Sequence, residues 1–257
     1  MVVKLFPSNN LVIVQARMTS TRLPGKVLQL LEESPLIDYQ LQRIRKSKLV
    51  QRIVVATSQE KSDDLLVEHL EHKSQAFVRG SLNDVLSRFV EALDIYQPDY
   101  FIRITGDCPL VMPEILDSMI EVFEKADLDY LSNALEPSFP DGLDIEIVKS
   151  SALRKLDTME LSLTEKEHVT LGIYSRPEMF RIQNYRNATD LSNERWTVDY
   201  PQDLEFVRRV VRYEKSQPEL LTLSQVLNFV RDYPEQRNTL AGNLRNEALK
   251  DWEREHE

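Results

Sequence analysis

Cysteine, glycine and long hydrophobic runs are all scarce in this sequence. Cys108 is the one cysteine among 257 residues, so the chain cannot form an internal disulfide. No apolar run approaches the roughly 20 residues that a membrane-spanning helix needs. The first ten residues lack the apolar stretch of a secretion signal. These absences predict a cytoplasmic protein that makes no contact with a membrane.

Positive charge is also in short supply. The formal net charge is −10, and 42% of the residues are hydrophobic, which is enough for a substantial core. An acidic chain without a broad basic face is not expected to bind nucleic acid. A small anionic ligand can still be bound where cations gather locally.

Strand-like and helix-like segments alternate along the first half of the chain. Buried strands are predicted at 11–16, 52–58 and 100–107. The helical spacing of apolar residues predicts helices at 35–47, 62–73, 81–96 and 113–126. This alternation predicts an α/β fold of three layers, in which a mostly parallel sheet has helices on both faces.

The regular alternation stops after about residue 128. Two less regular strands are predicted at 143–150 and 172–185, and strong helical patterns return at 201–215 and 221–233. The polar tail from Asn238 is also expected to be helical. We interpret residues 1–257 as one domain, with an excursion over about 133–183 and a helical C-terminal tail over about 220–257.

A basic loop, "ARMTSTRLPGK", follows the first strand. It carries Arg17, Arg22 and Lys26, with hydroxyls such as Ser20 between them. In open parallel sheets, ligands bind beyond the carboxyl ends of the strands. The loop is therefore a candidate triphosphate site, although it lacks the G-x-x-x-x-G-K-[ST] pattern. The alternative is a solvated basic loop.

Two aspartates share one local pattern. Asp107 ends the third strand in "RITGDCPL", and Asp199 follows a short apolar segment in "RWTVDYPQDL"; each is followed by x-Pro. Carboxylates that hold Mg²⁺ against substrate phosphates are a common arrangement. The repeated pattern predicts a paired metal site, and the alternative is that each aspartate only caps a turn or helix.

Acidic residues and one histidine are candidates for binding a second substrate. If 143–148 is a strand, Asp144 and Glu146 face the same side, with Asp141 just before them. They are suited to sugar hydroxyls or ammonium groups, and a polar edge-strand face is the alternative. His168 in "EHVT" is a further candidate ligand or base, unless it is structural. Cys108 is interpreted as a small buried side chain.

Seven motifs together resemble a known family. They are "IVQARMTSTRLPGKVL", "VVATS", "VRGSLNDVLSRF", "RITGDCPL", "FPDGLDIEIV", "EHVT" and "RWTVDYPQDL", in this order from about residue 11 to 235. The chain resembles the cytidylyltransferase family that includes CMP-sialic acid and CMP-KDO synthetases. Within that family it is most similar to the branch called spore coat polysaccharide biosynthesis protein F.

The resemblance implies a nucleotide-diphospho-sugar transferase-like fold and transfer of CMP from CTP to an acidic sugar, with release of pyrophosphate and use of Mg²⁺. It implies metal binding by Asp107 and Asp199. The expected catalytic residues are Arg17, Lys26, Asp107 and Asp199. Those expected to contact the nucleotide are Ala16, Arg17, Ser20, Arg22, Lys26, Arg79, Ser81 and Asp107. Acceptor contacts are expected from Asp141, Asp144, Glu146 and His168.

We therefore predict a CTP-dependent cytidylyltransferase in the synthesis of surface polysaccharide or glycoconjugate precursors. Three rivals stay open at this point: a nucleotidyltransferase with another nucleotide or a phosphate or phosphonate acceptor, a nucleotide-sugar-dependent glycosyltransferase, and a non-catalytic nucleotide-binding module. The glycosyltransferase is disfavoured because the one D-x-D motif, at 127–129, ends a predicted helix.

A homodimer is predicted to form through the excursion. The family suggests it, and so do apolar residues for which the excursion offers little core of its own. The alternative is that these residues fold back onto the parent sheet. They are Leu135, Phe139, Leu143, Ile173, Tyr174 and Phe180.

Overall fold

Three apolar runs form the centre of one sheet. In the computed structural model, which describes residues 9–238, they are β1 (Asn10–Gln15), β4 (Ile53–Ser58) and β6 (Tyr100–Thr105). β1 lies between the other two and pairs parallel with both. Central strands of a parallel sheet are buried on both faces, which is why their sequences are apolar runs rather than strict alternations.

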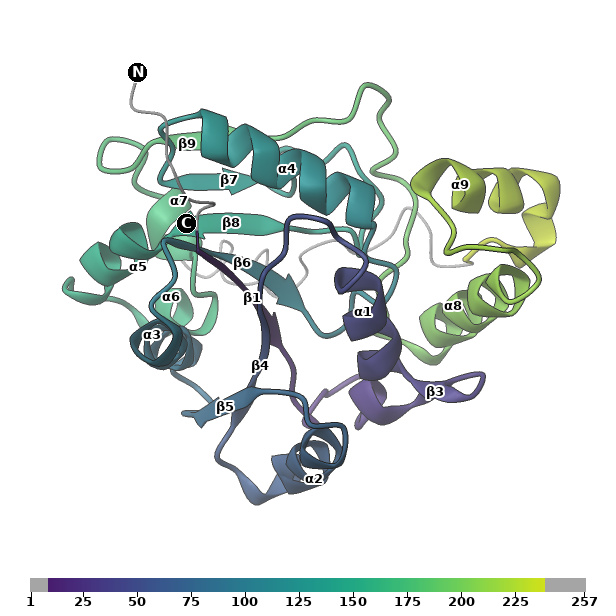
Figure 1. Ribbon diagram of the computed structural model, residues 1–257, viewed down its shortest axis with the longest axis horizontal. Helices are drawn as coiled ribbons and strands as arrows, with labels where there is room; N and C mark the ends of the chain where they lie inside the picture. Colours follow the sequence, from purple (N-terminus) through teal and green to yellow (C-terminus); the bar gives the residue numbers. More distant parts are fainter. Residues whose placement is uncertain (1–8, 239–257) are drawn as a thin grey trace.

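Four further strands complete a seven-stranded sheet in the order β5-β4-β1-β6-β8-β7-β9 (Figure 1). They are β5 (Phe77–Gly80), β7 (Tyr130–Ser132), β8 (Glu146–Lys149) and β9 (Ile182–Asn184). β8 is antiparallel to β6 and β7, and the other pairings are parallel. The predicted α/β class with a mostly parallel sheet is confirmed. A small hairpin of β2 (Leu30–Leu31) and β3 (Ser34–Pro35) stands apart from this sheet.

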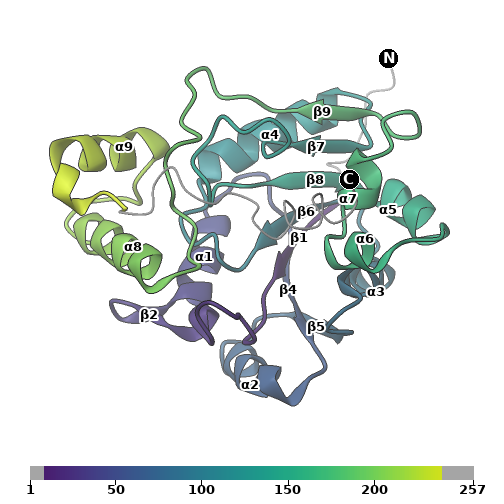
Figure 2. The same ribbon diagram turned by 180° about the vertical axis from the view of Figure 1, so that it is seen from behind.

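Helices cover both faces of the sheet, as the sequence predicts (Figures 1 and 2). One hydrophobic core contains α1 (Leu36–Ile44), α2 (Asp64–His72), α4 (Pro113–Lys125), α8 (Pro201–Glu214) and α9 (Leu223–Asp232). The core on the other face contains α3 (Val85–Tyr96), α5 (Ser150–Asp157) and α7 (Leu171–Tyr174), with α6 (Leu163–Glu167) beside α3. Short 3₁₀ turns are η1 (Lys26–Leu28), η2 (Lys61–Asp63) and η3 (Pro234–Gln236).

Two strands predicted in the irregular region are shorter in the structure. Of 172–185, only Ile182–Asn184 is a strand, and Leu171–Tyr174 is helical. A short apolar run cannot by itself distinguish helix from strand. Of 143–150, only β8 pairs in the sheet, because the Asn133 side chain takes the backbone hydrogen bonds of Leu143 and Ile145. Asp144 therefore lies outside the strand.

The apolar residues of the excursion are covered by their own chain. Phe139 and Leu143 are buried in the core that contains α4, and Ile173 and Phe180 in the core that contains α3. The two remaining residues pack partly buried against the α3 core; they are Leu135 and Tyr174. The excursion folds back onto the parent sheet, so the argument from composition for a dimer is wrong.

No helix among residues 9–238 combines the length and the apolar character that would let it cross a membrane. α9 is the described part of the predicted helical tail, and the helix expected beyond Asn238 lies outside the described residues.

Candidate active site

Lys26 is the centre of a polar cluster at the carboxyl ends of β1 and β6. The basic loop leaves β1 and turns back at Gly25, which has φ +70° and whose N–H donates to the Met18 carbonyl. The next residue is Lys26, and its Nζ donates to Asp107 Oδ2 at 2.9 Å and Asp199 Oδ1 at 2.9 Å. Lys26 Nζ also donates to the Val198 carbonyl oxygen, at 2.8 Å. The three hydrogens of the ammonium group are thus matched by three acceptors.

Burial and charge act in opposite directions on this cluster. Burial alone raises the pKa of Asp107, but Lys26 and a hydrogen bond from Thr105 outweigh it and lower that pKa to about 2. Burial likewise lowers the pKa of Lys26, and the charges of Asp107 and Asp199 outweigh it, so that its pKa is raised. At neutral pH, the Asp107 carboxylate and the Lys26 ammonium group are therefore both charged.

Asp199 is held from its other side by two arginines. Arg22 Nη2 lies 2.9 Å and Arg195 Nη2 lies 3.2 Å from Asp199 Oδ2. Both guanidinium groups also lie near the Tyr200 ring, at 5.2 Å and 6.0 Å from its centroid. The carboxylate of Asp199 therefore has no helix-capping role: Asp203 accepts the N–H groups of Asp199 and Tyr200 at the start of α8.

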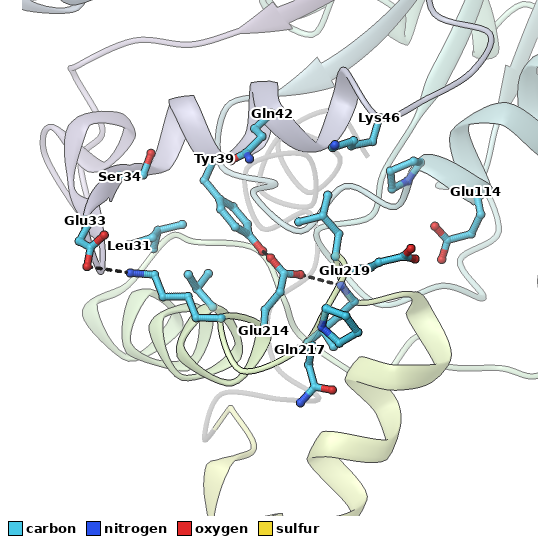
Figure 3. A pocket seen from close by; sticks show the side chains of 16 residues that line it. Leu31, Glu33, Ser34, Tyr39, Gln42, Lys46, Glu114, Glu214, Gln217 and Glu219 are labelled. Atoms are coloured by element: carbon cyan, nitrogen blue, oxygen red, sulfur yellow. Dashed lines mark hydrogen bonds and ion pairs between the residues drawn. The ribbon is translucent and has the colours of Figure 1, made fainter.

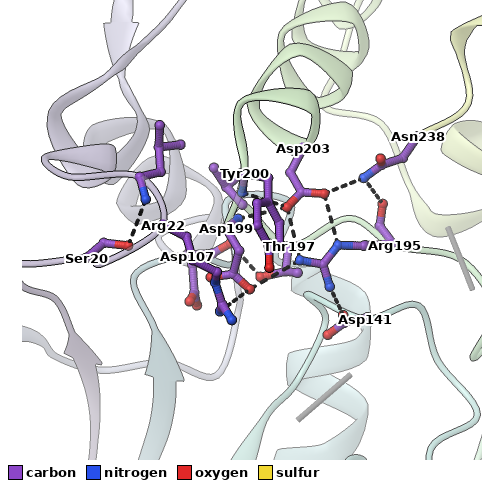
Figure 4. A network of polar contacts seen from close by, with 12 residues as sticks. Ser20, Arg22, Asp107, Asp141, Arg195, Thr197, Asp199, Tyr200, Asp203 and Asn238 are labelled. Carbon is purple, nitrogen blue, oxygen red and sulfur yellow. Dashed lines mark hydrogen bonds and ion pairs between the residues drawn. The ribbon is translucent and has the colours of Figure 1, made fainter. Parts of the chain in front are cut away.

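Arg195 is a site residue that sequence reasoning missed. Its side chain is only 3% exposed and contacts three aspartates: Asp141 at 2.7 Å, Asp203 at 2.9 Å, and Asp199 (Figure 4). Asn238 donates to the Arg195 carbonyl and to Asp203. A buried arginine needs such partners, but they lie at distant positions in the chain, and no local spacing marks them.

The segment before Asp199 is not a strand, contrary to the sequence prediction. Trp196 and Thr197 donate their N–H groups to the Asp141 carbonyl, and Val198 donates to the Asp107 carbonyl. Gly142 makes this close approach possible, because a Cβ there would lie 2.3 Å from Thr197 N. The two aspartates therefore do not share a strand-end geometry, although both contact Lys26.

A cleft of about 440 Å³ lies beside this cluster. It is lined by Gln15, Ala16, Arg17, Ser20, Thr21, Arg22, Lys26, Val27, Thr105, Gly106, Asp107 and Asp199. The structure thus brings together all the residues predicted to contact the nucleotide except Arg79 and Ser81. Arg17 makes no hydrogen bond or ion pair with any residue in the described range, so its guanidinium group is available to a ligand.

A larger cavity, of about 750 Å³, lies between α1, α8 and the segment after α8 (Figure 3). Its charged lining is mainly acidic, and Glu214 there is bound by Tyr39 and Arg43 at 2.7 Å and 2.6 Å. Lys215 is paired with Glu33 at 3.2 Å. An anionic nucleotide is therefore better matched by the smaller, basic cleft.

None of the four candidate acceptor contacts lines the cleft. Glu146 is 9% exposed and bound to Arg103, Tyr130 and Thr170. His168 lies within electrostatic range of Arg103 and Glu146. Burial, and after it the positive charge of Arg103, lowers the pKa of His168, so its imidazole is neutral at neutral pH. The other two of the four are Asp141, which pairs with Arg195, and Asp144.

Arg79 and Ser81 lie at the carboxyl end of β5, two strands from β1. Arg79 Nε donates to the Ser58 carbonyl at 2.9 Å, and Nη2 pairs with Asp64 at 2.8 Å. Ser81 is exposed, and its Oγ accepts the Asp84 N–H. Arg79 is therefore tied to the segment that follows β4.

An α/β sheet with a cation-rich loop and two carboxylates at its carboxyl edge defines a nucleotide-binding transferase. The comparisons with known proteins agree with this class. The cytidylyltransferase family model matches residues 11–242. The chain is 34% identical over 235 residues to spore coat polysaccharide biosynthesis protein SpsF of Bacillus subtilis (strain 168), covering 88% of this chain and 95% of that protein.

Two further relatives extend the comparison. A 3-deoxy-manno-octulosonate cytidylyltransferase of Chlorobium phaeobacteroides (strain BS1) is 27% identical over 247 residues, covering 78% of this chain and 96% of that protein. The structure of a cytidylyltransferase from Leptospira borgpetersenii serovar Hardjo-bovis (strain JB197) superposes with a TM-score of 0.85 at 31% identity, covering 90% of this chain and 98% of that one. The chain belongs to the cytidylyltransferase family and is a CTP-dependent nucleotidyltransferase.

Proposed function

We propose that this enzyme transfers CMP from CTP to an acidic sugar, releases pyrophosphate and supplies an activated precursor for a surface polysaccharide or glycoconjugate. The observation that carries this proposal is the cleft in which Arg17, Arg22 and Lys26 gather beside two carboxylates. The names of two relatives support the acceptor class, since one refers to a spore coat polysaccharide and the other to an acidic sugar.

The cleft is suited to in-line displacement at the α-phosphorus of CTP. A hydroxyl oxygen of the acceptor forms a bond to this phosphorus and gives up its proton to solvent, while the bond from the α-phosphorus to the oxygen bridging it to the β-phosphorus breaks and pyrophosphate leaves. Negative charge then grows on the pyrophosphate, where fixed cations stabilise it most effectively. Positioning and electrostatics therefore account for most of the rate in this proposal.

The carboxyl oxygens of Asp107 and Asp199 are donors of the kind that Mg²⁺ prefers. Both side chains point at one ammonium group, so a metal ion bound there beside nucleotide phosphates would meet two carboxyl groups as oxygen donors. Within residues 9–238, no group of three or more His, Cys, Asp or Glu side chains is arranged to hold a metal. We propose that these two aspartates hold Mg²⁺ together with substrate phosphates, where the ion would stabilise charge on the phosphates.

A screen of acceptors tests the proposed function directly. The enzyme is incubated with CTP, Mg²⁺ and single members of a panel of acidic sugars and phosphonates, and pyrophosphate release is followed. Release that depends on an acidic sugar supports the proposal. Release with phosphonates alone, or with UTP and not CTP, contradicts it.

Replacing Arg17 by alanine is expected to weaken CTP binding by about ten- to a hundred-fold. The change removes charge-assisted hydrogen bonds worth roughly 1.5–3 kcal/mol. The melting temperature is expected to stay the same, because Arg17 has no partner among the described residues. Isothermal titration with CTP measures the effect, and Arg154→Ala, which removes an exposed pair with Asp94, is the control. Wild-type affinity in Arg17→Ala contradicts the assignment.

A homodimer is a proposal that rests on the resemblance to the family alone. Light scattering at micromolar concentration is expected to give twice the chain mass. The mass of one chain would show that the site is complete within one copy.

A further inference from the structure

Gln15 lines the cleft from the last position of β1. Side chains alternate along a strand, and Leu11 and Ile13 pack in the core that contains α3, so Gln15 points to this face of the sheet. Val27, beside Lys26, packs in the core on the opposite face. Gln15 therefore approaches the cleft from the face that α3 covers, whereas the turn that carries Lys26 packs on the other face.

Arg103 fixes the orientation of the Gln15 carboxamide. Arg103 donates from Nε at 3.2 Å and from Nη2 at 3.0 Å to Gln15 Oε1. A guanidinium group has donors only, so the oxygen of the carboxamide has to face it. Arg103 in turn is held by Glu146, which accepts hydrogen bonds from Tyr130 and Thr170. The carboxamide cannot turn over without losing both bonds to Arg103.

The Nε2 group of Gln15 is left pointing away from Arg103. It has no partner among the described residues, and it is not one of their buried unpartnered atoms, so it is open to the cleft. Gln15 thus offers a ligand a hydrogen-bond donor and no acceptor.

One further residue on this face of the sheet has donors without a partner. Arg88 is 1% exposed, and its Nε and Nη1 are buried without a partner. It packs against Gly80 at the end of β5, where a Cβ would come within 2.5 Å of Arg88 Cγ. Burial, followed by the charge of Arg17 and that of Arg103, lowers the pKa of Arg88 to about 10. The unpartnered donors of Arg88 are buried and do not line the cleft, so Nε2 of Gln15 is the group by which this pair of residues can donate to a ligand there.

We propose that Gln15 selects cytosine over uracil, by donating from Nε2 to N3 of the base, and that Arg103 is the positioning residue that enforces this choice. The inference rests on the proposed use of CTP. N3 of cytosine accepts a hydrogen bond, whereas N3 of uracil carries a hydrogen. A glutamine that turned freely would serve either base, but the bonds from Arg103 leave only the donor, which uracil N3 cannot use.

The variant Gln15→Glu tests this role without disturbing Arg103. Glutamate keeps an oxygen for Arg103 and replaces the donor Nε2 by an acceptor. Isothermal titration with CTP and with UTP, both in Mg²⁺, gives the ratio of the two dissociation constants. The added negative charge weakens both nucleotides alike and cancels in this ratio. We expect the preference for CTP to fall about ten- to a hundred-fold.

A second variant, Arg103→Met, separates positioning from a purely structural role. Without Arg103 the carboxamide can turn, so UTP affinity is expected to rise while CTP affinity falls by about threefold or less. A purely structural loss would weaken both nucleotides equally. Arg154→Met, on the exposed surface beside Asp94, is the matched control and keeps the wild-type ratio. Circular dichroism shows which variants fold. If Arg103→Met does not fold, the result for Gln15→Glu decides the question.

The outcomes distinguish this inference from the proposed function. An unchanged ratio in folded Gln15→Glu overturns the role of Gln15 and leaves the use of CTP intact. Equal affinity of the wild type for CTP and UTP also overturns it. A wild type that binds neither nucleotide overturns the proposed function itself.

Discussion

Replacing Asp107 by asparagine is expected to lower turnover by about a hundred-fold or more while leaving the fold intact. Asparagine keeps the size of the side chain and an oxygen for the Thr105 hydroxyl, which donates to Asp107 Oδ1 at 2.5 Å. Lys26 also keeps Asp199 and the Val198 carbonyl. The variant loses one of two negative charges at the point where we propose Mg²⁺ binds, which corresponds to about 3 kcal/mol of transition-state stabilisation.

The measurement is the rate of pyrophosphate release over a range of Mg²⁺ concentrations. Asp107→Asn is expected to need more Mg²⁺ for half-maximal rate. Titration of Mn²⁺ in the presence of CTP gives a readout that is independent of turnover. Asp127→Asn is the control, because Asp127 is exposed and pairs with Arg181. Unchanged activity and unchanged metal dependence in Asp107→Asn would rule out the metal assignment.

The parts of this site that follow from local pattern were predictable. Arg17 and Asp107 follow buried strands closely, and Lys26 lies in the loop that follows β1. The strands of a parallel sheet end at one edge, so these side chains meet there. Asp199 was predicted through a strand that does not exist. Its position is set instead by backbone hydrogen bonds from 196–198 to Asp141 and Asp107, which only the folded chain brings within reach.

The residues that were missed or assigned differently are buried or partly buried polar groups with partners far away in the sequence. Arg195 contacts acids at positions 141 and 203, and Gln15 is held by Arg103 from another strand. For Glu146, strand alternation predicts a face of the sheet but not what covers that face. The cover is α7 and the turn before it, where Thr170 binds the carboxylate and Val169 has a φ of +54°. Such contacts depend on the assembled fold and leave no spacing in the sequence.

The packing of the excursion likewise could not be predicted from the sequence. Phe139, Leu143, Ile173 and Phe180 are apolar residues without local periodicity, which is compatible with either an interface or a core. In the structure, β7, β8 and β9 extend the sheet and both cores continue over them. The composition therefore identified the residues that are buried but not the surface that buries them.

Replacing Lys26 by methionine is expected to abolish measurable turnover and to destabilise the fold. The Lys26 side chain is 10% exposed, and it neutralises Asp107 and Asp199 together. Removing one partner of a buried ion pair costs about 3–5 kcal/mol. The Asp107 side chain is 26% exposed and Asp199 keeps two arginines, so we expect about 2–3 kcal/mol, or roughly 4–12 °C in melting temperature.

The pH dependence of that loss identifies its cause. In the wild type, the pKa of Asp107 is about 2, below its ordinary value of 3.8, so its contribution to stability is complete above the ordinary value and is lost only as pH falls through about 2. In Lys26→Met, burial is no longer opposed by the ammonium group and raises the pKa of Asp107 in the folded state. The folded variant then takes up a proton as pH falls, and its deficit in stability narrows.

Melting temperatures at pH 7.5 and pH 5 therefore test the electrostatic origin of the effect. The difference between wild type and Lys26→Met is expected to be smaller at pH 5. Lys215→Met is the control, because Lys215 is 45% exposed and pairs with an exposed glutamate, so its loss is expected to shift the melting temperature by about 1 °C or less at either pH. A deficit in Lys26→Met that is the same at both pH values would mean that lost packing, rather than the uncompensated carboxylate of Asp107, destabilises the variant.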